Sequence, residues 1–322
     1  MYNPSRRQFF LTAALATAAF GLNSRLFIPS ALAGAGIDPE QGVYKYKVGE
    51  VEVTALYDGI WRKPHDPAFI KNASVAETKD ALAKAGLTTE YMPIPLTVVV
   101  LKVGDRLIMI DSGSGAQWQP TAGRLYENMA KAGIDPTKIK TILISHFHPD
   151  HIFGLMHKGT NEPFYPDAEL IVSKTEYDWW TEPGRVEKLP DARKDLGKRI
   201  NAVFPTWKNF TFIEKDGEVV PGIELVKASG HTPGHSVFIV SSGNEQLMIS
   251  NDTAYVPALL APHPDWQGAY DQDGPTAVTT RKKIIDRVIA DKMKVCGAHF
   301  PFPGAGSFVK DGAAYAFTPV QA

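Results

Sequence analysis

The chain has 322 residues, of which 44% are hydrophobic and 21% charged, a composition typical of a soluble globular protein. Its formal net charge of -1 provides no basic surface for nucleic acid, so a small-molecule substrate is expected. Cys296 is the single cysteine, which excludes an internal disulfide.

Residues 1–33 have the features of an export signal. Arg6 and Arg7 precede an uncharged apolar run at 9–22, and residues 31–33 have the A-x-A form of a signal-peptidase site. As a helix the run would extend roughly 21 Å, less than the roughly 30 Å hydrocarbon core of a bilayer, so no stable membrane insertion is expected. Residues 5–10 resemble the twin-arginine signal. The resemblance implies twin-arginine export machinery as a partner, a periplasmic location and a mature domain at 34–322; a helix that stays attached is the alternative.

The rest of the chain alternates between strand and helix patterns. Strands are expected at residues 44–48, 51–56, 96–103, 106–110, 139–144, 169–172, 223–228, 237–240 and 246–249, with a closing hairpin at 307–319. Helices are expected at residues 74–85, 121–132 and 276–289, the first with capping-box spacing between Ser74 and Glu77. This order favours an α/β fold with two sheets packed face to face and helices outside. A doubly wound sheet would give a similar pattern and stays open at this point.

The loop after the strand at 139–144 has the composition of a metal site. Within six residues it contains His146, His148, Asp150 and His151. Neutral imidazole and carboxylate are the groups that bind zinc and similar ions. Side chains two residues apart in extended chain share a face, so His146 and His148 can bind one ion while the other two point to a second position.

Three further polar residues each follow a predicted apolar strand. His231 follows the strand at 223–228, Asp252 the strand at 246–249, and His299 the segment 293–298. A strand end is a rigid place from which to position a ligand. Each residue alone is weak evidence, but together they repeat the arrangement seen at the His146 loop.

These residues resemble the His-x-His-x-Asp-His signature and the later ligands of the metallo-β-lactamase-fold hydrolase superfamily. The resemblance covers the chain from about residue 43 onward and implies a four-layer αββα sandwich. It assigns one metal to His146, His148 and His231. It assigns the other to Asp150, His151 and His299, with Asp252 bridging the two and Asp111 supporting the site from behind.

The resemblance further implies two Zn²⁺ per chain, although imidazole and carboxylate also suit Mn, Co or Fe. A hydroxide that bridges the metals would attack an electrophilic carbonyl or phosphorus. Asp150 would accept the proton of the attacking water and pass it to the leaving oxygen. No organic cofactor is expected.

Three positions indicate the branch of the superfamily. The oxygen-reducing di-iron branch has a carboxylate where this chain has His148, and antibiotic-hydrolysing members generally lack the carboxylate at Asp252. Acyl-homoserine lactonases have a tyrosine three residues after the bridging aspartate, as Tyr255 is here. By this resemblance Tyr255 donates a hydrogen bond to the substrate. The layout is also similar to that of methyl parathion hydrolase.

The sequence thus predicts a dinuclear metal-dependent hydrolase acting on a lactone or ester, with quorum quenching as its role. A phosphotriester or arylester hydrolase is the alternative enzyme, and a catalytically inactive metal-binding protein is the alternative from another class. Trp179, Trp180 and Phe302 are expected to bind substrate through their aromatic surfaces. The sequence leaves open whether the protein forms a homodimer.

Overall fold

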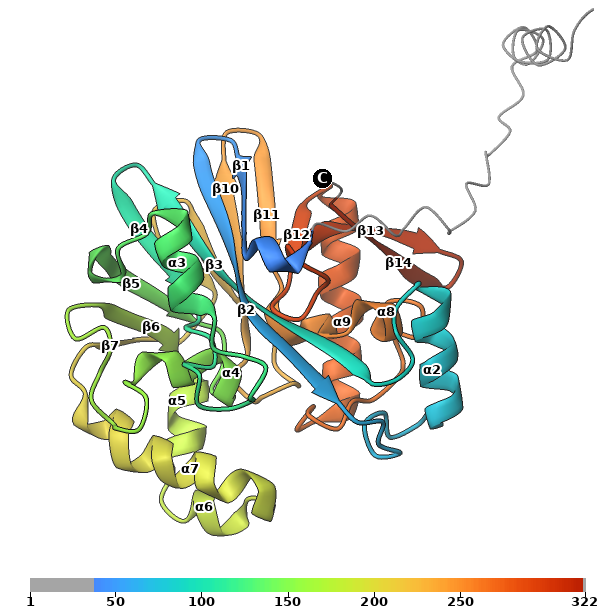
Figure 1. Cartoon of the computed structure of the whole chain (residues 1–322), viewed down its shortest axis with the longest axis horizontal. Coiled ribbons are helices and arrows are strands. Elements are labelled where there is room, and N and C mark those ends of the chain that lie inside the picture. The colour runs from blue at the N-terminus through green and yellow to red at the C-terminus, as the bar shows by residue number, and fades with distance from the viewer. Residues whose placement is uncertain (1–37, 321–322) are drawn as a thin grey trace, which may run out of the picture. The chain divides into compact units, whose positions relative to one another are not determined.

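The computed structural model describes residues 38–320, so the export signal expected at 1–33 lies outside the described residues. Two seven-stranded sheets face each other, and helices cover both outer surfaces (Figure 1). This arrangement confirms the predicted four-layer αββα sandwich. It excludes a doubly wound sheet, since the strands form two separate sheets.

The first sheet is formed by the N-terminal half of the chain in sequential order. Its strands are β1 (Val43–Val48), β2 (Val51–Lys63), β3 (Met92–Val103), β4 (Arg106–Ile110), β5 (Ile139–Ile144), β6 (Glu169–Ser173) and β7 (Phe210–Ile213). The pairs from β1 to β4 are antiparallel, whereas β4 to β7 run parallel. Parallel neighbours end at the same edge, which brings the segments after β4 and β5 together.

The second sheet is formed by the C-terminal half. Its strands, in spatial order, are β14 (Ala314–Pro319), β13 (Ala305–Asp311), β12 (Lys294–Cys296), β11 (Glu245–Ile249), β10 (Ser236–Ser242), β9 (Ile223–Lys227) and β8 (Gly217–Val220). The parallel pair β11–β12 brings two further strand ends to one edge. The expected closing hairpin is present as β13 and β14.

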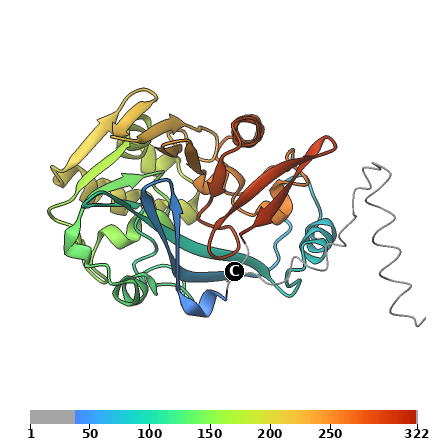
Figure 2. The same cartoon turned by 90° about the horizontal axis from the view of Figure 1, so that it is seen from above.

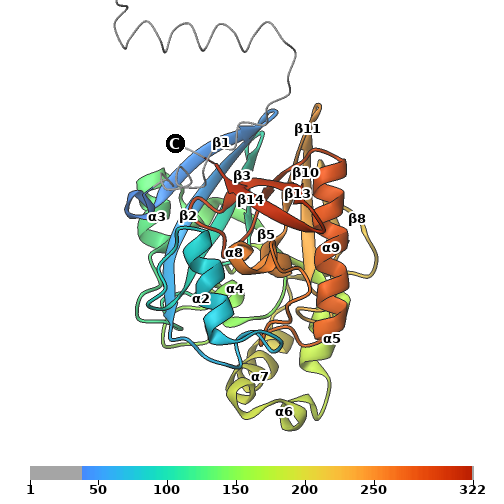
Figure 3. The same cartoon turned by 90° about the vertical axis from the view of Figure 1, so that its right-hand side faces the viewer.

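Helices form the two outer layers. They are α2 (Val75–Lys84), α3 (Leu125–Ala132), α4 (Pro149–Ile152), α5 (Lys174–Thr181), α6 (Arg185–Lys188), α7 (Asp191–Val203), α8 (Pro257–Leu260) and α9 (Gly274–Ala290). Side chains of α3, α5 and α7 pack on the first sheet, and those of α2, α8 and α9 pack on the second (Figure 3). Figure 2 views α9 end-on, beside β13. Among residues 38–320 no helix is both long and apolar enough to cross a membrane.

Apolar side chains on the inner faces of both sheets form the central core. Leu101 and Ile108 of the first sheet belong to the same buried cluster as Phe238, Leu247 and Ile249 of the second. Fully burying such a side chain stabilises the fold by about 1.5–3 kcal/mol. The two sheets are therefore rigidly joined, and so are the loops at their edges.

Several expected elements differ from the structure in their bounds: strand β3, for example, begins at Met92, four residues before the predicted start. The helix predicted at 121–132 begins only at Leu125, because the preceding residues pair with β2: Thr121 O accepts from Ile60 N, and Ala122 bridges Gly59. Strand β2 extends to Lys63, past a bulge at Asp58. The capping box of Ser74 and Glu77 on α2 is present as predicted.

Candidate metal centre

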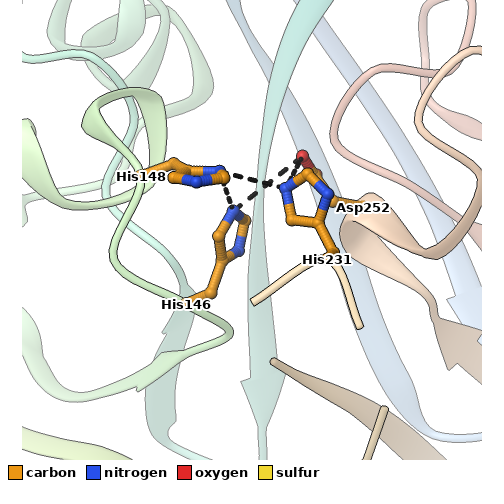
Figure 4. Close-up of side chains that lie close together, drawn as sticks. All are labelled: His146, His148, His231 and Asp252. Carbon is orange, nitrogen blue, oxygen red and sulfur yellow. Dashed lines mark hydrogen bonds and ion pairs between the residues drawn. The ribbon is translucent and has the colours of Figure 1, made fainter. Parts of the chain in front are cut away.

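All five predicted histidines and both predicted aspartates converge where strands of the two sheets end. Their possible ligand atoms form two groups, with the atoms of each group lying within 4.8 Å of one another. The first group is His146, His148, His231 and Asp252, and the second is Asp150, His151 and His299. Figure 4 shows the first group, with its side chains from the two sheets pointing toward one another. Each group contains one of the two triads that the resemblance implies, and Asp252 is grouped with the first.

Asp252 lies between the two groups. Its Oδ2 is 3.2 Å from Nε2 of His231 in the first group and 3.2 Å from Nε2 of His299 in the second. Its Oδ1 is 3.4 Å from Nε2 of His151. Asp252 thus lies close to histidines of both groups, the place that a carboxylate shared by two cations would occupy.

Hydrogen bonds behind the cluster orient three of the imidazoles. The Nδ1 atoms of His151, His231 and His299 lie 2.7 Å from Asp111 Oδ2, 2.9 Å from Asp271 Oδ1 and 2.8 Å from Pro95 O. Because these partners only accept, each Nδ1 carries a proton, and in the neutral form of each imidazole Nε2 presents a lone pair to the centre. This is the tautomer that a metal requires, held by the outer partners that metal-bound histidines commonly have.

The chemistry of the cluster fits divalent cations. His151 Nε2 and Asp252 Oδ1 are buried, 3.4 Å apart, and neither has a hydrogen-bond partner among residues 38–320. Burial alone would lower the pKa of His151, but the charges of Asp252, Asp150 and Asp111 outweigh it and raise the pKa to about 9. Burial and neighbouring histidines hold the pKa of His146 well below its usual range. The carboxylates therefore create a negative field around the imidazoles, which a bound cation would neutralise.

Asp111, at the end of β4, joins two strand ends behind the cluster. Its carboxylate accepts from both the backbone N–H and the hydroxyl of Ser145, at 2.7 Å each, and from His151. Its φ of 57° lies in the left-handed region, which aspartate tolerates better than most residues. Asp111 thereby holds the start of the His146 loop from behind the cluster. The resemblance implies this position for Asp111.

Glu176 on α5 is a buried carboxylate that connects two loops of the cluster. Its Oε1 accepts from Phe147 N and Trp180 Nε1 at 2.9 and 2.8 Å, and its Oε2 accepts from Thr232 Oγ1 and Gly234 N at 2.6 and 3.0 Å. In the sequence, Phe147 lies between His146 and His148, and Thr232 follows His231. Burial raises the pKa of Glu176, although the four donors oppose the shift. The sequence analysis missed this residue, because no local motif marks it.

Replacing Glu176 by glutamine is expected to lower the free energy of unfolding by about 3 kcal/mol. The amide NH₂ would face two of the four donors, and each buried donor left unsatisfied costs about 1–3 kcal/mol. Urea denaturation in the presence of chelator measures the change without a contribution from metal binding. Glu187→Gln, exposed on the neighbouring α6, is the matched control. A loss below 1 kcal/mol for Glu176→Gln would show that the carboxylate is not needed there.

Asp271 and Arg281 form a second supporting group that the sequence analysis missed. Asp271 binds His231 through Oδ1, and its Oδ2 is 3.2 Å from Nη2 of the fully buried Arg281. Arg281 also donates to the backbone oxygens of Thr253 and Trp266. One buried ion pair therefore holds His231, the segment after Asp252 and the loop before Asp271.

A cavity of about 200 Å³ opens onto the two groups of candidate ligands. Polar atoms of His148, Asp150 and Asp252 lie at its base, while Trp61, Trp118, Ile94, Leu196 and Tyr270 provide apolar walls. The rings of Trp61 and Trp118 are 4.9 Å apart, and those of Trp61 and Tyr270 are 5.8 Å apart. The cavity thus combines a polar floor with an aromatic wall, the usual composition of a small-molecule site.

Tyr255 lines this cavity, as predicted for a residue that touches substrate. Its ring centroid is 5.5 Å from that of His231. The hydroxyl is buried and has no hydrogen-bond partner among the described residues. Gly268 leaves the room for it, since any Cβ there would overlap the hydroxyl. An unpaired donor is therefore held beside the candidate ligands.

The expectation that Trp179, Trp180 and Phe302 bind substrate is corrected, because none of them lines the cavity. Trp180 is fully buried and donates to Glu176, behind the His146 loop. Trp179 packs against Trp180 and the Arg185 guanidinium. Phe302 is buried against Tyr57. Their aromatic surfaces stabilise the core, and the wall comes instead from Trp61, Trp118 and Tyr270, which no motif marks.

Relatives of known activity match part of the chain. An N-acyl homoserine lactonase of Bacillus thuringiensis is 31% identical over 177 residues, 55% of this chain and 62% of that relative. One from Bacillus sp. is 26% identical over 177 residues, with the same coverage of 55% and 62%. The match therefore spans less than two thirds of these relatives.

Solved structures match the fold over most of the chain. AidC, a dizinc quorum-quenching lactonase in complex with a product, has a TM-score of 0.77 and 29% identity, covering 87% of this chain and 98% of that one. The hydrolase AbOPH of the β-lactamase superfamily has a TM-score of 0.80 and 26% identity, with the same coverage of 87% and 98%. Residues 93–299 match the profile of the metallo-beta-lactamase superfamily. This chain belongs to the metallo-β-lactamase superfamily.

Proposed function

We propose that the protein is a dinuclear zinc-dependent lactonase that opens N-acyl homoserine lactones. One observation carries the proposal: five of the seven candidate ligands line one cavity together with Tyr255, whose buried hydroxyl has no partner among the described residues. The similarity to N-acyl homoserine lactonases supports the substrate class. The donor set suits zinc, and it would also accept Mn, Co or Fe.

Divalent ions bound in the cluster would supply an acidified water and polarise the lactone carbonyl. Side chains of the protein would provide the hydrogen bond and the proton transfers. Tyr255 donates a hydrogen bond from its hydroxyl to the carbonyl or ring oxygen, where negative charge develops. Asp150, whose Oδ2 is 3.2 Å from His299 Nε2, accepts the proton of the attacking water on its carboxylate. When the ring C–O bond breaks, Asp150 returns the proton to the leaving oxygen, and a hydroxy acid is formed.

A comparison of substrates tests the proposal. We expect kcat/KM of the metal-loaded protein to be at least about a hundredfold higher for N-hexanoyl-L-homoserine lactone than for methyl paraoxon. The second candidate, phosphotriester or arylester hydrolysis, is favoured by the aromatic wall of Trp61, Trp118 and Tyr270, which would accept an aryl leaving group. A hundredfold preference for methyl paraoxon would replace the first proposal by the second. Two bound metals without turnover of any ester, lactone or phosphotriester would indicate a metal-binding protein.

Tyr255→Phe is expected to lower kcat for the lactone by about tenfold to a hundredfold with unchanged metal content, because it removes one donor to developing charge. Steady-state kinetics and elemental analysis measure the two quantities. Tyr46→Phe is a control, since Tyr46 also has a buried hydroxyl but does not line the cavity. Unchanged lactone turnover in Tyr255→Phe would remove this tyrosine from the mechanism.

We also propose that residues 1–33 direct export to the periplasm through the twin-arginine pathway. The paired Arg6 and Arg7, the short apolar run and the A-x-A site support this proposal. Cell fractionation with an Arg6→Lys/Arg7→Lys variant tests it. A wild-type chain that stays in the cytoplasm would refute the proposal.

A further inference from the structure

Arg193, on α7, is a cation in the wall of the catalytic cavity. Its side chain lines the same cavity as His148, Asp252 and Tyr255. Its Nη2 donates to the backbone oxygen of Tyr270 at 3.2 Å. The arginine therefore faces the place where a substrate would lie, and it does so from the segment between β6 and β7.

Arg193 differs from the two lysines of its helix. Lys194 and Lys198 form ion pairs with Asp191 and Asp195 at 2.8 and 3.2 Å. Within residues 38–320, no carboxylate lies within 4.0 Å of the Arg193 guanidinium. The two lysines are thus ordinary surface pairs, whereas Arg193 has no carboxylate within ion-pair distance in the described part of the chain, and the charge of Asp271 acts on it from farther away.

A guanidinium in this position has spare hydrogen-bonding capacity. It carries five N–H donors in a planar fork, and Tyr270 O is the hydrogen-bond acceptor found for it among residues 38–320. Burial lowers the pKa of Arg193 from its ordinary value, yet an arginine stays charged at neutral pH. Burial and the charge of His231 lower the pKa of His148, and the charge of Arg193 contributes to the same shift. An oxygen acceptor on a bound ligand would satisfy the free donors.

The rest of the wall restricts which ligand could provide that acceptor. Trp61, Trp118, Ile94 and Leu196 contribute mainly apolar surface to the same cavity, and Gln119 contributes an amide. A matching ligand therefore has an apolar arm with an oxygen acceptor on it, apart from the group that is hydrolysed. An N-acyl homoserine lactone with an unsubstituted chain has one oxygen acceptor besides its ring ester, namely the carbonyl of its acylamino group.

We propose that Arg193 determines specificity by donating hydrogen bonds to the acylamino carbonyl of the substrate, so that the enzyme prefers acylated amino-lactones to plain alkyl lactones. The inference rests on the proposed lactonase function. The metal cluster and Tyr255 would act on the ester, which both classes of lactone share. Arg193 would act only on the group that distinguishes them.

Arg193→Met removes the donors and keeps an apolar side chain of similar length. For N-hexanoyl-L-homoserine lactone we expect KM to rise about tenfold with kcat changed less than about threefold, the effect of losing hydrogen bonds to a charged donor. For γ-decalactone, which has no acylamino group, we expect kcat/KM to change less than about twofold. Arg193→Lys keeps the charge and is expected to recover part of the lost affinity.

Lys198→Met is the matched control, since Lys198 is an exposed cation on the same helix. It is expected to behave as the wild-type chain on both substrates. An equal loss on both lactones in Arg193→Met would show that Arg193 only maintains the structure. Wild-type kinetics on both would show that it does not contact substrate. Either result overturns the inference while the lactonase function stands.

A binding measurement separates failure of the inference from failure of the proposed function. If the wild-type chain opens neither lactone, the proposed function is wrong, and calorimetry with N-hexanoyl-L-homoserine still tests Arg193. At least about tenfold weaker binding by Arg193→Met than by the wild-type chain supports the acylamino subsite. Equal affinities, or no binding by either protein, overturn it.

Discussion

Asp252→Asn is expected to lower kcat/KM on the lactone by about a thousandfold and to reduce bound metal from two ions per chain to about one. Asp252 oxygens lie 3.2 to 3.4 Å from His231, His299 and His151, which belong to both groups of candidate ligands. An asparagine has a single acceptor oxygen and no charge, so it cannot bridge two cations. Losing a preorganised electrostatic contact of this kind costs about 10²–10³ in rate, and losing an ion adds to that.

Elemental analysis and steady-state kinetics on the same preparation measure both effects. Asp167→Asn is the control, because Asp167 is an exposed aspartate that pairs with Lys140 far from the cavity. If Asp252→Asn keeps two ions per chain and loses less than threefold in kcat/KM, Asp252 does not bridge.

Asp271→Asn is expected to weaken metal binding about ten- to a hundredfold and to lower the free energy of unfolding by about 3–5 kcal/mol. The first effect arises because asparagine has no charge and only one acceptor oxygen for two donors, His231 Nδ1 and Arg281 Nη2, so the imidazole loses the carboxylate that fixes its tautomer. The second arises because Arg281, fully buried, would keep its charge without a counterion.

A double variant separates these two effects. Asp271→Asn/Arg281→Met removes the unpaired charge, so much of the lost stability should return while metal affinity stays low. Chelator competition measures affinity, and urea denaturation of the metal-free protein measures stability. Asp265→Asn, exposed on the same loop region, is the control. Recovery of metal affinity in the double variant would contradict the role assigned to Asp271.

The ligand set could be predicted from the sequence because each residue follows an apolar strand or belongs to one dense motif. The loop from His146 to His151 has a spacing that packing does not explain, and Asp252 and His299 each come after an apolar strand. Strand periodicity and turn residues also predicted most of the strands and α2 with its capping box. These signals depend only on residues close together in the chain, so they can be recognised in a single sequence.

The supporting residues and the cavity wall could not be predicted in this way. Glu176, Asp271 and Arg281 act through contacts with loops 10 to 58 residues away in the chain, and no periodicity encodes such contacts. The sequence suggests Trp179 and Trp180 as wall residues only because they are aromatic and lie in an insert. The insert folds into α5 to α7, and the side chain of Trp180 points into the core. Which aromatic rings face a cavity is decided by tertiary packing.

Anomalous diffraction from crystals of the zinc-loaded protein, recorded at the zinc absorption edge, tests the central claim most directly. Two peaks per chain are predicted, one among His146, His148 and His231 and the other among Asp150, His151 and His299, with Asp252 between them. A single peak, or peaks outside these residues, would contradict the two-metal centre.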